Sequence, residues 1–145
     1  MKQGDDDNSK LLERFKNDNE SVLFATDSFW QGVDILGESL SQVIIVKLPF
    51  SVPNDPVFMA RSEAIEKRGG SSFMELSVPE AVIKFRQGIG RLIRRSDDKG
   101  VVTVLDKRIY EKRYGANFIN SLYECKKTYA PLDELTKTIN RFIFD

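Results

Sequence analysis

The sequence predicts an α/β domain in which a mostly parallel sheet carries helices on both faces. Short apolar runs typical of buried strands alternate with longer segments of helical periodicity, and this alternation favours a parallel sheet. The chain has 145 residues, 41% of them hydrophobic and 30% charged, which is ordinary for one soluble globular domain with a sizeable core. We expect residues 1–8 to be a flexible start and residues 9–145 to form the domain.

Three strands are predicted, at residues 21–26, 42–48 and 101–105. The first is a short apolar run bounded by polar residues, and the other two are rich in β-branched side chains. Ligands of parallel α/β sheets bind beyond the carboxyl ends of the strands. The segments that follow the strands should therefore lie along one edge of the domain; they are residues 27–34, 49–56 and 106–108.

Helices are predicted at residues 56–68, 79–95, 109–123 and 132–143, with a shorter one capped by Asn8 or Ser9. In the 79–95 helix each residue turns by about 100°, so five apolar residues share one stripe. Gln87, Arg91 and Arg94 fall on the opposite face, with Gly90 at its edge.

The glycines of this helix suggest that its polar face has a function. Gly88 and Gly90 each disfavour a helix by about 1 kcal/mol relative to alanine. Close approach of a ligand or another backbone is the usual compensation. Two guanidiniums one turn apart, beside a glutamine, suit a polyphosphate. The alternative is a merely solvated basic face.

Composition excludes several kinds of site. Histidine is absent and Cys125 is the single cysteine, which excludes histidine chemistry, an intrachain disulfide and an all-cysteine metal cluster. No apolar run is long enough to span a membrane, so we expect a cytoplasmic protein with no membrane contact. The net charge of zero divides into −5 for residues 1–79 and +5 for residues 80–145. That asymmetry indicates either a phosphate-facing surface or chance combined with an acidic start.

The pattern Gln87-x-x-Gly90-Arg91-x-x-Arg94 resembles the arginine-finger motif of superfamily 2 helicases. The resemblance implies that Arg91 and Arg94 are catalytic and reach the γ-phosphate of ATP held on a neighbouring RecA-like domain. It also implies that Gln87 and Gly90 belong to the nucleotide site.

Residues 26–34 resemble motif V of the XPD/DinG branch, in which a strand is followed by S-F-W-E-G-x-D. The resemblance implies that Gly32 and Asp34 lie at the nucleotide. It places Ser28, Phe29, Trp30 and Gln31 towards DNA, although core packing is an alternative for the two aromatic residues. Gln31 stands where many members have glutamate, so it cannot supply that negative charge.

Two further segments resemble the DinG branch. Residues 48–56 match L-P-F-x-x-P-x-x-P, for which we weigh DNA contact by Pro49, Ser51 and Asn54 against a rigid connector without ligand contact. Asp106-Lys-Arg108 is similar to the family's D-x-R, and we expect an ion pair that secures the strand end rather than a direct ligand.

Together these segments resemble the second RecA-like domain of a DinG-type DNA helicase, from the group without iron–sulfur cysteines. The sequence contains neither a phosphate-binding G-x-x-x-x-G-K-[ST] loop nor a D-E-x-H box. The resemblance thus implies that ATP and Mg²⁺ are bound mainly by an absent first lobe, that this chain holds no metal or iron–sulfur cluster, and that alone it is inactive. Because the strand expected before Gln3 is missing, we also expect truncation at the N-terminal side and self-association through an exposed sheet edge.

The function implied is that of a second motor lobe, which supplies arginine fingers to ATP on the first lobe and grips single-stranded DNA. The alternative is a non-motor, ATP-sensing module that regulates a linked nuclease or a protein partner. Gln31, in place of glutamate, favours the alternative.

Overall fold

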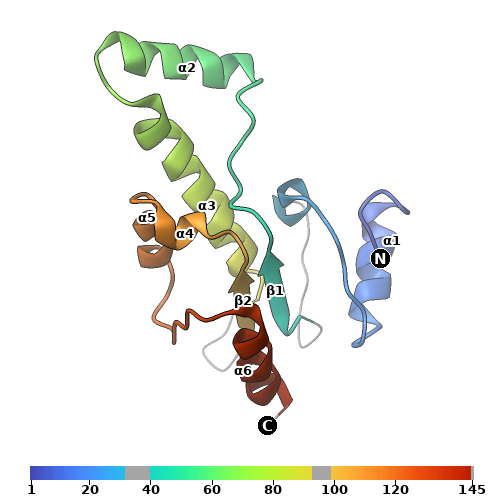
Figure 1. Cartoon of the computed structure of the whole chain (residues 1–145). Helices are drawn as coiled ribbons and strands as arrows, with labels where there is room; N and C mark the ends of the chain where they lie inside the picture. Colours follow the sequence, from blue (N-terminus) through green and yellow to red (C-terminus); the bar gives the residue numbers. More distant parts are fainter. Residues whose placement is uncertain (32–39, 93–98, 145) are drawn as a thin grey trace. The chain divides into compact units, whose positions relative to one another are not determined.

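The computed structural model describes residues 1–31, 40–92 and 99–144 (Figure 1). The chain divides into two compact units. Unit 1 consists of Met1–Ile44, Gln87–Thr103 and Glu124–Asp145, and unit 2 of Ile45–Arg86 and Val104–Tyr123. Gly32, Asp34 and Arg94, three of the predicted nucleotide-site residues, lie outside the described residues.

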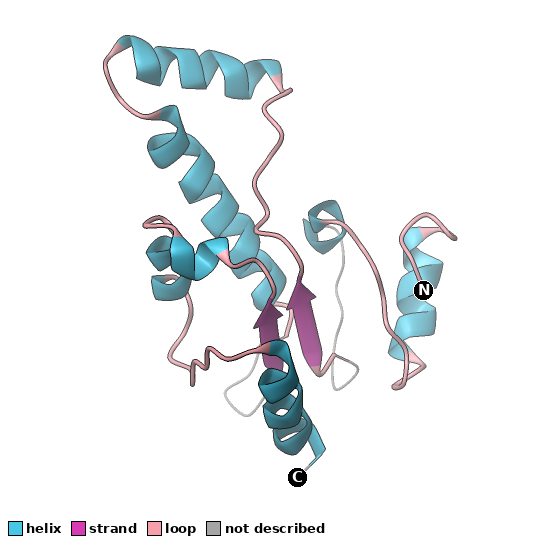
Figure 2. Ribbon diagram, in the orientation of Figure 1, coloured by secondary structure: helices cyan, strands magenta, loops and turns pink. Residues whose placement is uncertain are grey.

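The two strands β1 (Gln42–Ile45) and β2 (Val101–Val104) pair in parallel (Figure 2). The Val101 N–H donates to the Ser41 carbonyl at 3.0 Å, and the Leu105 N–H donates to the Ile45 carbonyl at 2.9 Å. The pairing therefore advances in the same direction along both strands. This confirms the predicted α/β class with a parallel sheet, although both strands are shorter than predicted.

The predicted strand at residues 21–26 is wrong. Among the described residues, its ladder contact is an isolated parallel bridge between Lys2 and Phe24. The Met1 amino group donates to the Val22 carbonyl at 2.8 Å, and the Gln3 N–H donates to the Phe24 carbonyl at 2.8 Å. Phe24 is 68% exposed, so this segment is not a buried strand. The same bonds involve part of the start that the sequence predicts to be flexible.

Helix α1 (Asn8–Lys16) begins after Asp7, whose carboxylate accepts the Ser9 N–H at 2.9 Å. The cap thus lies one residue before the two candidates that the sequence offers. Phe15 is buried on this helix and packs with Phe29 in a small core. The partly buried side chains around that core are Met1, Leu12, Leu23 and Leu40.

Helix α2 (Pro56–Lys67) confirms the helix predicted at 56–68. The Asp55 carboxylate accepts the Val57 N–H at 2.8 Å, and Pro56 occupies the first helical position, where a missing N–H costs nothing. Beyond the helix, Gly69 takes a φ of +82°, which other residues rarely adopt. Because none of its residues is buried, α2 contributes an exposed element to unit 2.

The helix predicted at 79–95 begins earlier than expected. A π-helical turn at Phe73–Ser77 leads directly into α3 (Val78–Ile89). Pro79 accounts for the wide turn, since it lacks an N–H and its ring would clash with the carbonyl four residues before it. The Val78 N–H instead donates to the Phe73 carbonyl, five residues back.

The same helix also ends earlier than expected, at Ile89. A tight turn follows, in which the Arg91 N–H donates to the Gly88 carbonyl at 3.3 Å. The low helix propensity of Gly88 and Gly90 explains this end. The prediction that Arg91 shares one helical face with Gln87 is therefore wrong, because Arg91 lies beyond the helix.

Two short helices, α4 (Arg108–Glu111) and α5 (Gly115–Asn120), replace the single helix predicted at 109–123. Gly115 lies so close to the Ile109 carbonyl that a Cβ would stand 2.0 Å from its oxygen. Glycine therefore permits the chain to fold back between the two helices. On α5, the fully buried Phe118 meets Phe85 edge-on at 5.3 Å and centres the core of unit 2.

The last helix, α6 (Leu132–Phe144), agrees with the prediction at 132–143. Its side chains alternate between apolar and polar with helical periodicity, and none is buried. Among the described residues, no helix combines the length and hydrophobicity that crossing a membrane would require.

Candidate functional site

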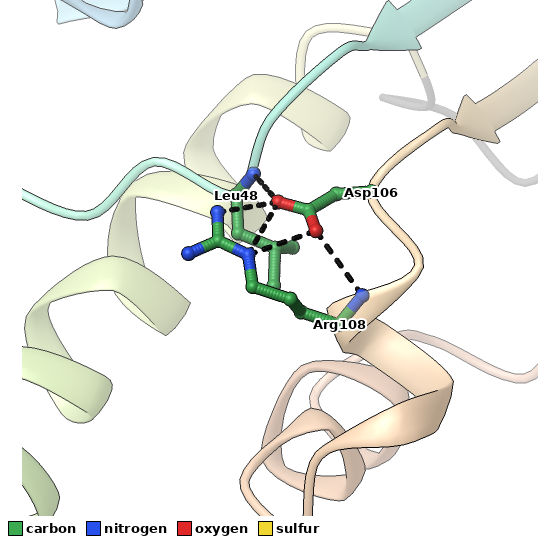
Figure 3. Close-up of polar contacts among 3 residues, drawn as sticks. All are labelled: Leu48, Asp106 and Arg108. Atoms are coloured by element: carbon green, nitrogen blue, oxygen red, sulfur yellow. Dashed lines mark hydrogen bonds and ion pairs between the residues drawn. The ribbon is translucent and has the colours of Figure 1, made fainter.

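The carboxyl ends of the two strands are joined by Asp106 (Figure 3). Its Oδ2 accepts the Leu48 backbone N–H at 2.9 Å. Its Oδ1 accepts the Arg108 backbone N–H at 3.1 Å, and the Arg108 guanidinium binds both oxygens, with Nη2 at 2.6 Å from Oδ2. The segments after β1 and β2 therefore meet at one edge, as the strand-end rule predicts. The ion pair expected from the D-x-R pattern is confirmed.

The electrostatics of this network favour the charged carboxylate. The Asp106 side chain is 7% exposed, whereas that of Arg108 is 40% exposed. The hydrogen bond from Arg108 lowers the pKa of Asp106 from 3.8 to about 2, against the opposing effect of burial and with help from the Leu48 N–H. The same pairing raises the pKa of Arg108. The network consequently acts as a structural clamp on the strand ends.

Arg108 also holds the loop that follows β1. Its guanidinium carbon lies 5.5 Å from the centre of the Phe50 ring. The Phe50 ring stacks on Phe73 at 5.6 Å and meets Tyr114 and Phe118 edge-on at 5.6 and 5.8 Å. Arg108 thus contacts both Asp106 and the Phe50 ring, and these contacts hold the start of the loop in a defined position.

The three residues of this loop that were predicted to contact DNA differ in accessibility. Pro49 is buried, Ser51 is half-buried and Asn54 is exposed. The Asn54 N–H donates to the Val52 carbonyl at 2.8 Å, which turns the loop just before α2. Ser51 and Asn54 therefore keep accessible surface, whereas Pro49 matches the rigid-connector interpretation.

Ser51 makes two contacts with α3. Its hydroxyl donates to Glu80 Oε1 at 3.0 Å and accepts from Lys84 Nζ at 2.7 Å. Glu80 and Lys84 lie one turn apart, with Nζ and Oε1 separated by 3.8 Å. Sequence reasoning missed both residues as partners of the loop. The only available signal was their i, i+4 spacing, which is also common on ordinary helix surfaces.

The segment that resembles motif V begins with a 3₁₀ helix at Asp27–Gln31. Phe29 is 3% exposed and belongs to the core with Phe15, so the structure matches its core-packing interpretation and not a ring facing DNA. Ser28 is exposed, and its Oγ lies 2.8 Å from Thr26 Oγ1. The side chains of Trp30 and Gln31 lie outside the described part of the structure.

The arginine segment is anchored by apolar residues on either side of Arg91. Ile89 and Leu92 are buried, whereas Gln87 is exposed and Arg91 is half-buried. Gly100 fits directly against Leu92, since a Cβ there would stand 2.6 Å from the leucine side chain. Packing therefore fixes the turn while polar groups at Gln87 and Arg91 still reach the surface.

Within the described residues, no group of three histidine, cysteine, aspartate or glutamate side chains could hold a metal ion.

Comparisons with known proteins identify the family to which the chain belongs. The family model described as "Helicase C-terminal domain" matches residues 1–125. "ATP-dependent DNA helicase YoaA" of Haemophilus influenzae is 48% identical over 126 residues, which are 87% of this chain and 20% of that protein.

Two further relatives are named DinG. "ATP-dependent helicase DinG" of Mycobacterium tuberculosis is 50% identical over 113 residues, 78% of this chain and 17% of that protein. "3'-5' exonuclease DinG" of Bacillus subtilis is 46% identical over 113 residues, 78% of this chain and 12% of that protein. The chain thus spans at most a fifth of the length of these curated relatives. It belongs to the family of helicase C-terminal domains, which have a RecA-like α/β fold.

Proposed function

We propose that the chain is the second motor lobe of an ATP-dependent DNA helicase. The main support is the turn after α3, in which the buried residues Ile89 and Leu92 fix the backbone position of the half-buried Arg91. Burial of these two residues holds the backbone of Arg91 in place, which supports a fixed position for a cation that meets a phosphate. The names of the relatives, which include ATP-dependent DNA helicases, support the same function.

In this proposal ATP and Mg²⁺ are bound mainly by a first lobe, and this chain completes the site. Arg91 and Arg94 act as catalytic arginine fingers on the γ-phosphate. Gln87, Gly90, Gly32 and Asp34 line the same nucleotide from this side. Charge stabilisation by arginine fingers is a large term in phosphoryl transfer, because the reaction depends mainly on positioning and electrostatics.

Single-stranded DNA is the proposed second ligand. Contacts come from Ser28 and the backbone of the 3₁₀ helix in unit 1, and from Ser51 and Asn54 in unit 2. These are polar groups without an arrangement for reading base edges, so binding should tolerate any sequence.

Binding of single-stranded DNA should therefore weaken steadily as salt rises. Each strand phosphate that the protein neutralises releases counterions and steepens the fall of log K with log salt concentration by about 0.7. Titration of labelled oligonucleotides of different sequence into the intact helicase, at several salt concentrations, measures this. Salt-independent or strongly sequence-selective binding would contradict the proposed mode of contact.

The chain alone should neither hydrolyse ATP nor bind it tightly. It has no phosphate-binding loop and no D-E-x-H carboxylate, and a solvent-exposed ion pair contributes only about 0–1 kcal/mol. Micromolar affinity needs roughly 8 kcal/mol. Calorimetric titration of Mg-ATP into the isolated chain measures this, and micromolar binding would reveal a nucleotide site on this chain itself.

The motor function is tested by comparing DNA-stimulated ATP hydrolysis with strand displacement in the intact protein. A motor lobe predicts that both activities occur and that both are lost together when Arg91 is replaced. ATP binding without unwinding would contradict the motor function and favour an ATP-sensing module.

A further inference from the structure

The direction of the hydrogen bonds between Ser51 and α3 bears on ligand binding. A serine hydroxyl has a single proton to donate, and here that proton goes to Glu80 Oε1 at 3.0 Å. The hydroxyl oxygen in turn accepts from the Lys84 ammonium at 2.7 Å. A carboxylate oxygen therefore occupies the donor of Ser51.

A phosphate would need the same donors. Phosphodiester oxygens, like carboxylate oxygens, accept hydrogen bonds from hydroxyl and ammonium groups and carry negative charge. The Ser51 hydroxyl can donate to such an oxygen only after it releases Glu80. Glu80 and a phosphate are therefore competitors for one position.

The burial of the two charged side chains decides which one can leave. The Glu80 side chain is 39% exposed, whereas that of Lys84 is 19% exposed. Glu80 can turn into water at little desolvation cost, while Lys84 stays beside the hydroxyl. When the carboxylate turns away, the Ser51 proton becomes available while the Lys84 ammonium still lies 2.7 Å from the hydroxyl oxygen.

We propose that Ser51 and Lys84 form a binding site for one backbone phosphate of single-stranded nucleic acid, which Glu80 occupies until the strand arrives. This inference rests on the proposed function, because it assigns a particular site to the DNA-binding loop. It adds two residues, Glu80 and Lys84, and gives them opposite effects. Lys84 attracts the strand, and Glu80 lowers the affinity for it.

The surroundings suit a site of this kind. The start of the loop is fixed by Phe50, which lies among Phe73, Tyr114 and Arg108. The exposed Asn54 lies three residues beyond Ser51 in the same loop. A strand phosphate at Ser51 would therefore meet a donor that is already positioned, and Glu80 is the group that has to move.

The test is the affinity of the intact helicase for a labelled oligothymidine, measured without nucleotide at low salt. Glu80→Gln keeps the shape of the side chain and removes its charge, so it should tighten binding by about two- to fivefold. Ser51→Ala and Lys84→Met should weaken binding. In the Lys84→Met background, Glu80→Gln should lose most of its effect, because both residues act on one phosphate.

A matched control lies on α2. Glu63 and Lys67 form an i, i+4 ion pair of 2.7 Å, and both side chains are exposed. Glu63→Gln and Lys67→Met make the same chemical changes without a serine partner, and they should alter affinity by less than the variants at Glu80 and Lys84. Equal effects at the two pairs would mean that only the net charge of the protein matters, and they would overturn the proposed phosphate site.

The chemistry of the ligand is tested with two further arms. An oligothymidine with neutral methylphosphonate linkages should show no gain from Glu80→Gln. Inorganic phosphate as competitor should leave the gain intact if the site takes a strand phosphate. Abolition of the gain by inorganic phosphate would show a free-anion site and overturn the assignment to nucleic acid.

The decisive outcome is the sign of the Glu80→Gln effect. If Glu80 only supports the loop, the variant will bind the strand more weakly or equally, and the proposal fails while the helicase function stands. Glu80→Ala provides a second variant, and thermal unfolding of each shows that it is folded. If the wild-type protein itself does not bind single-stranded DNA, the proposed function fails as well.

Discussion

Replacing Arg91 or Arg94 by alanine in the intact helicase should lower the turnover number of DNA-stimulated ATP hydrolysis by roughly 10³-fold or more. Each guanidinium is proposed to stabilise the charge that develops on the transferred phosphoryl group. Each variant removes a cation from a fixed place, and such preorganised charges are a large part of transition-state stabilisation. Steady-state hydrolysis at saturating ATP and single-stranded DNA measures the effect.

Arg86 provides the matched control for this prediction. It lies in the last turn of α3, is exposed, and has its guanidinium carbon 5.6 Å from the centre of the Tyr123 ring. Arg86→Ala removes the same charge from the last turn of α3, at a position outside the proposed nucleotide residues. Turnover should change far less than in the Arg91 variant, and equal losses would contradict the assignment.

Replacing Asp106 by alanine should lower the free energy of unfolding by about 3 kcal/mol. The variant leaves the Leu48 N–H without its acceptor and removes the partner of Arg108. The estimate stays at the lower end for a broken buried pair, because Arg108 is 40% exposed and water can solvate it. Denaturant unfolding at neutral pH measures the change, and a loss below about 1 kcal/mol would contradict the clamp.

The same carboxylate gives a defined dependence of stability on pH. Because folding lowers its pKa from 3.8 to about 2, the folded state favours the ionised form. The contribution of roughly 2 kcal/mol is fully present above pH 4 and is lost as the pH falls through about 2. Unfolding of the wild type and of Asp106→Asn between pH 2 and 6 should show curves that converge at the acid end.

Short sequence patterns predicted those helices and strands whose formation depends on residues close together in the sequence. The helical pattern at residues 56–68 predicted α2, and the β-branched residues at 42–45 and 101–104 predicted the two strands. The failures have long-range or backbone causes. Gly115 breaks a helical pattern because of its contact with Ile109, and Pro79 forces a wide turn inside a helix instead of starting one.

In the candidate site, too, contacts between near neighbours in the sequence could be predicted, and contacts between distant residues could not. Asp106 and Arg108 are two residues apart, so their sequence pattern was sufficient to predict the ion pair. Ser51 lies 29 residues from Glu80 and 33 from Lys84, and no periodicity connects a loop with a helix over that separation. Phe29 shows the remaining limit, since one aromatic residue in a motif fits a core position and a ligand contact equally well until its burial is known.

The central claim is that this chain supplies arginine to ATP bound elsewhere, and single-turnover hydrolysis by the Arg91→Ala variant tests it most directly. Rapid quench of ATP bound to the DNA-loaded intact helicase gives the rate constant of cleavage, and a separate titration gives the affinity for ATP. The claim predicts that cleavage slows by roughly 10³-fold while ATP affinity changes far less. Cleavage at the wild-type rate, with any loss confined to ATP affinity, would contradict it.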